Sequence, residues 1–204
     1  MMRRWVIVLT TVSCMSGGCM TKPLSVSFDL GGNTVSKKAW LEIYGESFSR
    51  PEGLLLDPIV VICNDGTVVR SLGSSHGGPP YAFGQADTRA IAEFRERVEV
   101  VVRERSWGTR TNYLAPDASH IVMKGYVNHG YMELRSWHDL LEQDETVVAT
   151  ERGSEPLNGR KRSDVLAGQS EDIRLFRKAW DSIKNGALSL PLTNTRTIQS
   201  AHID

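Results

Sequence analysis

Apolar and polar side chains alternate without interruption over residues 24–30. This stretch reads LSVSFDL, with four apolar side chains on one face and three polar ones on the other. A period of two residues is typical of a strand with one buried face. Two glycines and an asparagine follow at 31–33, and the apolar-rich stretch 37–44 then predicts a strand that returns beside the first.

A β-hairpin over residues 58–72 is the strongest local signal. Two runs rich in valine and isoleucine flank the sequence NDG at 64–66, whose glycine can adopt the positive φ that a tight turn requires. We therefore expect 59–63 and 67–72 to pair antiparallel. The next residues, GSSHGGPPYAFGQ at 73–85, have the composition of a loop.

A second hairpin is predicted over residues 120–135, with its turn at 128–130. We expect it to lie beside the first hairpin in one sheet. Ser136 and Asp139 then resemble a helix-capping box, which predicts a short helix over 136–143.

Two longer segments have the period of a helix. Over 87–106, apolar residues recur every three or four positions after Asp87, a residue type that caps helix N-termini. Two acid–base pairs four residues apart support this helix: Glu93 with Arg97 and Glu99 with Arg103. Residues 170–190 form a second apolar stripe, which ends before Pro191. Both helices are expected to face a core.

The order of these elements predicts the fold class. Short turns join the strands, and no long crossover connects them. We therefore expect an α+β fold, in which an antiparallel sheet built from hairpins has helices packed on one face. A single domain should span residues 24–192, followed by a flexible tail at 193–204.

The first 18 residues have the layout of an export signal. Arg3 and Arg4 precede an apolar run over 5–15, and small residues follow at 16–18. The run has 11 residues, well short of the ~20 that cross a bilayer as a helix. We therefore predict a signal peptide at 1–18, with a buried N-terminal strand as the alternative.

The end of this segment, MSGGCM, resembles the signal of bacterial lipoproteins, in which a short box of small residues precedes the cysteine that receives the lipid. Gly18 and Cys19 match that pattern, whereas Ser16 stands where the family has a larger aliphatic residue. The resemblance implies lipidation at Cys19, with 19–23 as a short tether. Lipidation at Cys14 and ordinary secretion with cleavage after Gly18 are the alternatives.

Charge and cysteine content exclude several classes of function. The chain has 24 basic and 24 acidic residues, and loss of the leader with its two arginines leaves a net charge of about −2 over 186 residues. Nucleic-acid binding needs a clustered positive excess instead. The basic run at 160–162 lies between turn residues and is expected to be a solvated loop. Cys63 stands alone in an apolar run, so we expect a buried thiol and no disulfide framework.

Three histidines are the first candidates for chemistry. His120 and His138 would lie near each other at the base of the second hairpin, where Asp117 or Asp139 could complete a zinc site. His129 would lie at the far tip. Because the sequence contains no tight ligand motif here, we expect ordinary histidines that do not converge on a metal.

A hydrolase site around Ser74, Ser75 and His76 is the second candidate. Hydrolases of the α/β type hold the nucleophile in G-x-S-x-G between a strand and a helix, and this loop lacks that context. No phosphate-binding loop or dinucleotide fingerprint occurs. Four aromatic residues at element ends could line a groove, although packing at the hairpin bases explains them better: Trp107, Trp137, Tyr81 and Tyr126.

Four segments within residues 137–184 are similar to a group of uncharacterised exported proteins of planctomycete-type bacteria: WHDLLEQ, VVAT, NGRKRSDVLAGQ and FRKAWDSIK. The resemblance covers under half of the mature chain and implies export, with no activity or site residue attached. We therefore expect an exported, lipid-anchored protein of the periplasm or cell envelope. It would be a non-catalytic binding or assembly module for a peptide, glycan or protein, without a cofactor. The alternative is an envelope hydrolase or metal-dependent enzyme that uses His76 or the His120/His138 pair.

Overall fold

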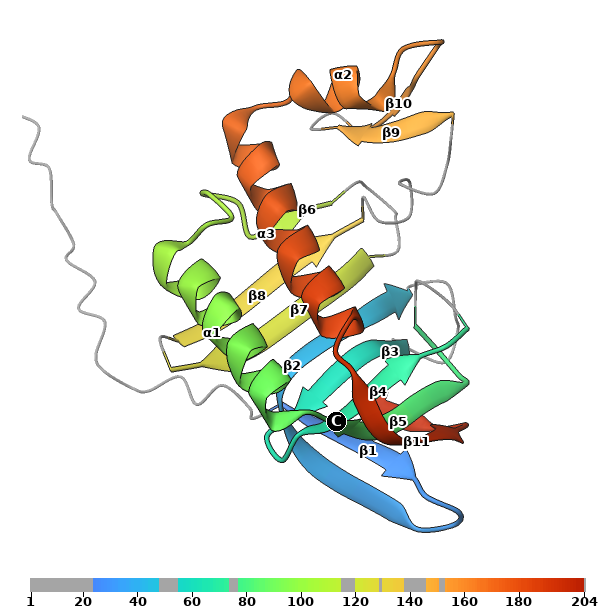
Figure 1. Cartoon of the computed structure of the whole chain (residues 1–204). Helices are drawn as coiled ribbons and strands as arrows, with labels where there is room; N and C mark the ends of the chain where they lie inside the picture. Colours follow the sequence, from blue (N-terminus) through green and yellow to red (C-terminus); the bar gives the residue numbers. More distant parts are fainter. Residues whose placement is uncertain are drawn as a thin grey trace, which may run out of the picture.

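The computed structural model describes residues 24–47, 55–73, 77–114, 120–128, 130–137, 146–150 and 153–203. The fold is α+β, with a large, mostly antiparallel sheet and few helices (Figure 1). The predicted signal peptide, Cys14, Cys19 and the tether lie outside the described residues.

The strands and helices follow the chain in this order. The strands are β1 Ser25–Asp29, β2 Thr34–Ser47, β3 Leu55–Cys63, β4 Thr67–Ser71, β5 Tyr81–Ala86, β6 Asn112–Tyr113, β7 His120–Val127, β8 Gly130–Ser136, β9 Val147–Thr150, β10 Gly153–Pro156, β11 Leu192–Ile198 and β12 Ala201–Ile203. The helices are α1 Thr88–Glu104, α2 Arg162–Ala167 and α3 Glu171–Leu188. None of the helices in the described ranges is long and apolar enough to cross a membrane.

The predicted pair of strands over 24–44 and the predicted hairpin over 58–72 are confirmed. β1 and β2 pair antiparallel, and Val26 and Phe28 are buried as the alternation predicts. β3 and β4 also pair antiparallel, with Val61 opposite Val69. Their turn contains Gly66 at φ 87°, a conformation that a side chain would disfavour.

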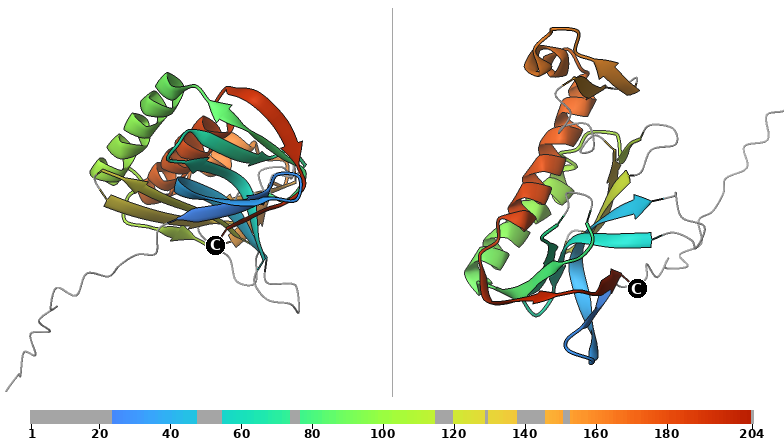
Figure 2. Two further views of the ribbon diagram at one scale, coloured as in Figure 1. Left: turned by 90° about the horizontal axis from the view of Figure 1, so that it is seen from below. Right: turned by 90° about the vertical axis from the view of Figure 1, so that its right-hand side faces the viewer.

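Pairing continues from these hairpins until seven strands form a closed ring. From β2 it passes through β3, β4 and β5 to β11. Two residues, 199–200, lead from β11 to β12, which pairs with β1, and β1 pairs with β2. In Figure 2, β11 and β12 curve around the other strands and meet β1. The strands that begin and end the described chain thus close the ring together.

The inside of this ring is apolar. Phe28 from β1 and Phe83 from β5 meet with their ring centroids 4.9 Å apart. Cys63 is buried in the same cluster, as predicted, and its thiol is free. The whole cluster consists of Leu24, Val26, Phe28, Ala39, Val61, Cys63, Val69, Tyr81, Phe83, Ile198 and Ala201.

Two predictions about the ring strands are wrong. Residues 193–204, predicted as a flexible tail, contain most of β11 and all of β12. Most of β11 is exposed on both faces, so the sequence there shows no buried stripe. Residues 73–85, predicted as a loop, contain most of β5, which is buried on both faces and therefore shows no alternation. Gly84 lets β11 approach, because a Cβ there would lie 2.9 Å from the Thr193 carbonyl oxygen.

The second half of β2 belongs to a separate wing of the sheet. There β2 pairs with β7, β7 with β8, and the short β6 runs parallel to the end of β8. The hairpin predicted over 120–135 is confirmed. Its turn has two residues, since Val127 lies opposite Gly130. Ser136 is part of β8, so the helix predicted to begin there is wrong at its start, and 138–143 lie outside the described residues.

The two long helices begin where the sequence predicts. The Asp87 side chain accepts a hydrogen bond from the Ala90 amide at 3.0 Å, and Ser170 caps α3 through the Ile173 amide at 3.4 Å. Both helices contribute to one apolar cluster with β2, β3, β4, β7 and β8. Its members include Trp40, Ile43, Ile62, Phe94, Val98, Trp107, Tyr113, Ile121, Met123, Leu134, Trp137, Phe176, Trp180 and Ile183.

The predicted acid–base pairs on α1 are replaced by others. The observed pairs are Arg89 with Glu93 at 2.8 Å and Arg95 with Glu99 at 3.9 Å. Arg97 lies over the ring of Phe94, and Arg103 lies 3.5 Å from Glu104. An aromatic neighbour therefore takes the place of a carboxylate for Arg97.

The sequence interpretation missed a small unit formed by β9, β10 and α2. It lies beyond the N-terminal end of α3 in Figure 1. The Arg162 guanidinium donates to the Val147 carbonyl at 2.7 Å and joins α2 to β9. Arg160 lies 3.8 Å from Glu155 of β10. Arg160 and Lys161 are exposed and precede the helix, as predicted for a solvated loop, whereas Arg162 begins α2 and its half-buried side chain connects α2 to β9.

Candidate functional site

Polar and aromatic side chains, with one valine among them, occupy every second position of three neighbouring strands in the wing. We call this set the polar face: Glu42, Tyr44 and Glu46 on β2, His120, Val122, Lys124 and Tyr126 on β7, and Tyr131, Glu133 and Arg135 on β8. The residues between them, such as Ile43, Met123 and Leu134, belong to the apolar cluster that includes the helices. Because side chains alternate across a strand, the polar face lies on the opposite side of the sheet.

Arg135 joins carboxylates from two strands. Its Nη1 donates to Glu46 Oε2 at 2.6 Å, and its Nε donates to Glu133 Oε1 at 2.8 Å. The Tyr131 hydroxyl donates to the other oxygen of Glu133 at 2.6 Å. Glu46 is 5% exposed, so its hydrogen bond with Arg135 compensates a largely desolvated charge. These contacts hold four side chains in one fixed arrangement.

Tyr44 and Lys124 form the centre of the polar face. Tyr44 is 1% exposed, and the Lys124 ammonium lies 5.4 Å from the centroid of its ring. Burial raises the pKa of the Tyr44 phenol above its usual value despite the nearby ammonium. Burial acts to lower the pKa of Lys124, but its hydrogen bond with Tyr44 and the negative charge of Glu133 raise it overall. Both groups therefore stay protonated at neutral pH.

The outer part of the polar face also has fixed protonation states. Partial burial acts to raise the pKa of Glu133, but hydrogen bonds from Tyr131 and Arg135 and two positive charges lower it overall. Burial and the Glu133 carboxylate raise the pKa of Tyr131. Glu133 is thus ionised and Tyr131 is neutral near pH 7. General acid–base catalysis favours groups that titrate near the working pH, and these groups do not.

An aromatic pair lies at the turn end of the polar face. The rings of Tyr126 and Tyr131 have centroids 4.9 Å apart and are tilted by 39°. Among the described residues, Tyr131 is one of three large apolar or aromatic residues that are exposed, with 38% of its surface accessible. Together the pair offers an apolar surface beside charged groups.

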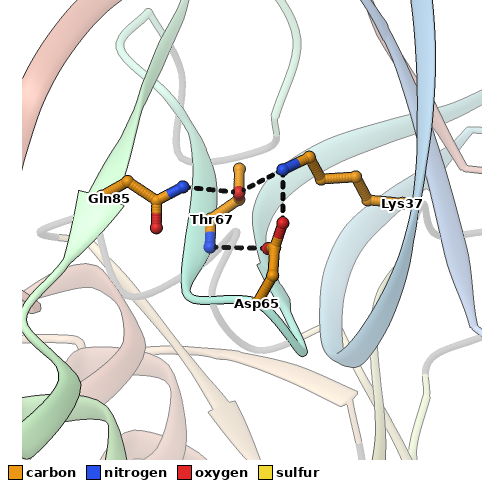
Figure 3. Close-up of polar contacts among 4 residues, drawn as sticks. All are labelled: Lys37, Asp65, Thr67 and Gln85. Carbon is orange, nitrogen blue, oxygen red and sulfur yellow. Dashed lines mark hydrogen bonds and ion pairs between the residues drawn. The ribbon is translucent and has the colours of Figure 1, made fainter.

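A second polar cluster, shown in Figure 3, lies at the turn between β3 and β4. Lys37 of β2 forms an ion pair with Asp65 and donates to the Thr67 hydroxyl at 2.9 Å. Gln85 of β5 donates to the same hydroxyl at 2.9 Å. Thr67 is fully buried, and its amide donates to Asp65 at 3.0 Å. Partial burial acts to raise the pKa of Asp65, but these hydrogen bonds lower it overall. The cluster ties three strands to one turn and serves structure.

A hollow of about 550 Å³ lies between β10, α2 and the start of α3. Glu155 lines it, accepts a hydrogen bond from the Thr150 hydroxyl at 2.9 Å, and pairs with Arg160. Asp164 and Ser170 complete its polar lining. The main charges of this hollow are engaged with each other.

Of the histidine, serine and aspartate candidates named from the sequence, the structure describes only His120. His120 begins β7 at the edge of the polar face. His76, His129 and His138 lie outside the described residues, as do Ser74, Ser75, Asp117 and Asp139, so the predictions made for them stay predictions. Among the residues that the structure describes, no three histidine, cysteine or acidic side chains could hold a metal ion.

Cys63 and the four aromatic residues are divided among three parts of the fold. Burial raises the pKa of the Cys63 thiol to about 12, which leaves it unreactive at neutral pH. Tyr81 lies inside the ring with Cys63. Trp107 and Trp137 belong to the apolar cluster that includes the helices, and Tyr126 lies on the polar face. The polar face itself was missed, although the alternation in LEIYGE, HIVMKGYV and YMELRS was readable in the sequence.

Comparison of the chain with protein-family models, with curated protein sequences and with solved structures finds no match in any of the three. The function therefore has to be argued from the geometry of the site.

Proposed function

We propose that the protein is an exported binding module of the cell envelope, anchored by a lipid on Cys19 and without catalytic activity. The export-type layout of residues 1–18, the lipoprotein-like sequence before Cys19 and the resemblance of 137–184 to exported proteins support the location. Two or more acyl chains on one cysteine would hold such a protein firmly at a membrane, whereas one chain would not.

In this proposal α1 and α3 cover one face of the wing, and the outer part of the polar face, around Tyr131, Glu133 and Arg135, is left for a ligand. The shared apolar cluster of the two helices with β2, β7 and β8 supports this arrangement. An antiparallel sheet commonly keeps one polar face toward solvent, but here a connected row of paired charges lies beside an exposed tyrosine, and this combination suits ligand recognition.

The single observation that carries the binding role is the connected group of Glu46, Arg135, Glu133 and Tyr131. Its donors and acceptors are fixed before a ligand arrives, so binding loses little side-chain entropy. The exposed tyrosine ring beside charged hydrogen-bonding groups suits a glycan, which presents apolar ring faces and hydroxyls together. We therefore propose a cell-wall glycan as the ligand.

Co-sedimentation with purified, protein-free cell-wall sacculi tests this proposal. The Cys19→Ala chain lacks the lipid and should sediment with sacculi at neutral pH. Tyr131→Ala should lower the bound fraction several-fold, because the stacking surface is lost. Glu133→Gln should have a similar effect because it releases Arg135 and Tyr131.

Leu72→Ala is the matched control, since Leu72 is a 54% exposed apolar side chain outside the polar face. It should sediment like the parent chain. Binding that is absent in the parent, or that falls equally in Leu72→Ala and Tyr131→Ala, would refute the glycan proposal.

A further inference from the structure

The sheet forks at one residue of β2. On one edge, β2 pairs with β1 as far as Lys38, and from Leu41 onward it pairs with β7 instead. On its other edge, the register with β3 shifts between Ala39 and Leu41. Trp40 therefore lies in a bulge at the point where β1 and β7 separate. Bulges of this kind redirect side chains and often border binding sites.

A cavity of about 250 Å³ occupies this fork. Leu24 at the start of β1 and Tyr126 near the end of β7 form its two sides, and Trp40 lines it from β2. Lys38, Asn64 and Arg95 supply its polar lining, from β2, from the turn after β3 and from α1. Elements that are far apart in the sequence thus meet around one small space.

The polar lining consists of donors, and two of them are cations. No carboxylate is among the described residues that line the cavity. Arg95 lies over the Trp40 ring at 5.2 Å, and its contact with Glu99 is long, at 3.9 Å. Glu99 also accepts a hydrogen bond from Asn128 at 2.8 Å.

The two remaining donors are free. Within the described part of the chain, Lys38 makes no ion pair, and the Asn64 side chain has no hydrogen bond. The nearby carboxylate of Asp65 is engaged by Lys37 and by the Thr67 amide. The charge of Lys38 is therefore not balanced in the fork, and the charge of Arg95 has only the long contact with Glu99.

We propose that this cavity binds a phosphate group. Lys38 and Arg95 would contact its charged oxygens, with the Asn64 amide as a further donor. A guanidinium offers a planar pair of donors and an ammonium a compact charge, and the two together suit a doubly charged tetrahedral anion better than a carboxylate.

The phosphate belongs either to a free small molecule or to a lipid headgroup. Five residue steps separate Cys19 from Leu24, which is at most ~18 Å of extended chain. The headgroup source therefore rests on the proposed lipid anchor, whereas the phosphate site itself does not.

The test uses the Cys19→Ala chain, so its result does not depend on lipidation. Calorimetric titration with inorganic phosphate at low ionic strength should show saturable binding. The double variant Lys38→Gln/Arg95→Gln should bind about tenfold more weakly or worse, since two charge-assisted hydrogen bonds are lost. Both side chains are partly or fully exposed, and the single variant Lys38→Gln, whose side chain packs in no apolar cluster, gives an intermediate loss without risk to the fold.

Arg97→Gln/Lys178→Gln is the matched control. It removes the same charge from exposed positions of α1 and α3, and it should bind phosphate like the parent. A second arm measures flotation with vesicles of phosphatidylglycerol and of phosphatidylcholine. Phosphate binding without flotation assigns a free ligand, and flotation that requires Lys38 and Arg95 assigns a headgroup. If the parent shows neither phosphate binding nor flotation, or if the control variant loses phosphate binding as much as Lys38→Gln/Arg95→Gln does, the proposed site is wrong.

Discussion

Two carboxylates of the described chain are held in their ionised form by neighbouring side chains. Glu133 is fixed by Tyr131 and Arg135, and Asp65 by Lys37 and Thr67. The pKa values of both carboxyl groups are lowered. A carboxyl group whose pKa is lower in the folded than in the unfolded state stabilises the fold above the unfolded value. That contribution disappears as the pH falls through the folded value.

Glu133→Gln should therefore destabilise the protein in a pH-dependent way. We expect a loss of about 1 kcal/mol in the free energy of unfolding at pH 7, where the parent has an ionised Glu133. The difference should shrink as the pH falls from the usual carboxyl pKa through the lowered pKa of folded Glu133, because the parent then protonates the same group. Urea unfolding at a series of pH values measures it. Glu96→Gln, on the exposed side of α1, should show no such trend; a constant deficit in Glu133→Gln would contradict the assignment.

At the scale of elements, the sequence predicted what a regular period reveals. The alternation in β1, the NDG turn after β3 and the capped stripes of α1 and α3 all appear where expected. The sequences of β5 and β11 show no alternation of apolar and polar residues. β5 is buried on both faces, and β11 is mostly exposed on both faces. Closure of the ring depends on these two strands, so it could not be foreseen.

The polar face was hidden for a related reason. Alternation predicts that Glu46 and Arg135 each lie on the polar side of a strand. Their contact spans 89 positions in the sequence, and it follows only from the order of β2, β7 and β8. Pairing order across a sheet is a tertiary property that local patterns do not encode.

Removal of residues 192–204 should abolish cooperative folding. β11 and β12 are the strands that connect β5 to β1, and Ile198 and Ala201 fill the ring interior. Without them, β5 and β1 become open edges and the interior cluster is exposed. Circular dichroism during thermal unfolding should show a broad, non-cooperative change. Deletion of Asp204 alone is the control and should unfold like the parent; a sharp transition in the shorter chain would mean that the ring is dispensable.

The whole molecule combines a closed ring, a wing with the polar face, and a small unit beyond α3. The described chain begins at Leu24, directly before the ring strand β1, and Leu24 lines the fork. If Cys19 carries the lipid, only residues 20–23 separate the anchor from the fold, and the ring is held close to the membrane surface. The polar face would then lie close to the membrane and to ligands in the envelope, as the proposed binding role requires.

The mass of the mature N-terminus tests the central claim, that the protein is exported and anchored through Cys19. The full chain and its Cys19→Ala variant are produced in bacteria, the cells are fractionated, and the N-terminal peptide is analysed by mass spectrometry. We predict that the parent is found in the membrane fraction and begins at a lipid-modified Cys19, whereas the variant is in the soluble fraction. A parent chain that still begins at Met1, or one that begins at Cys19 without lipid in the soluble fraction, would contradict the account.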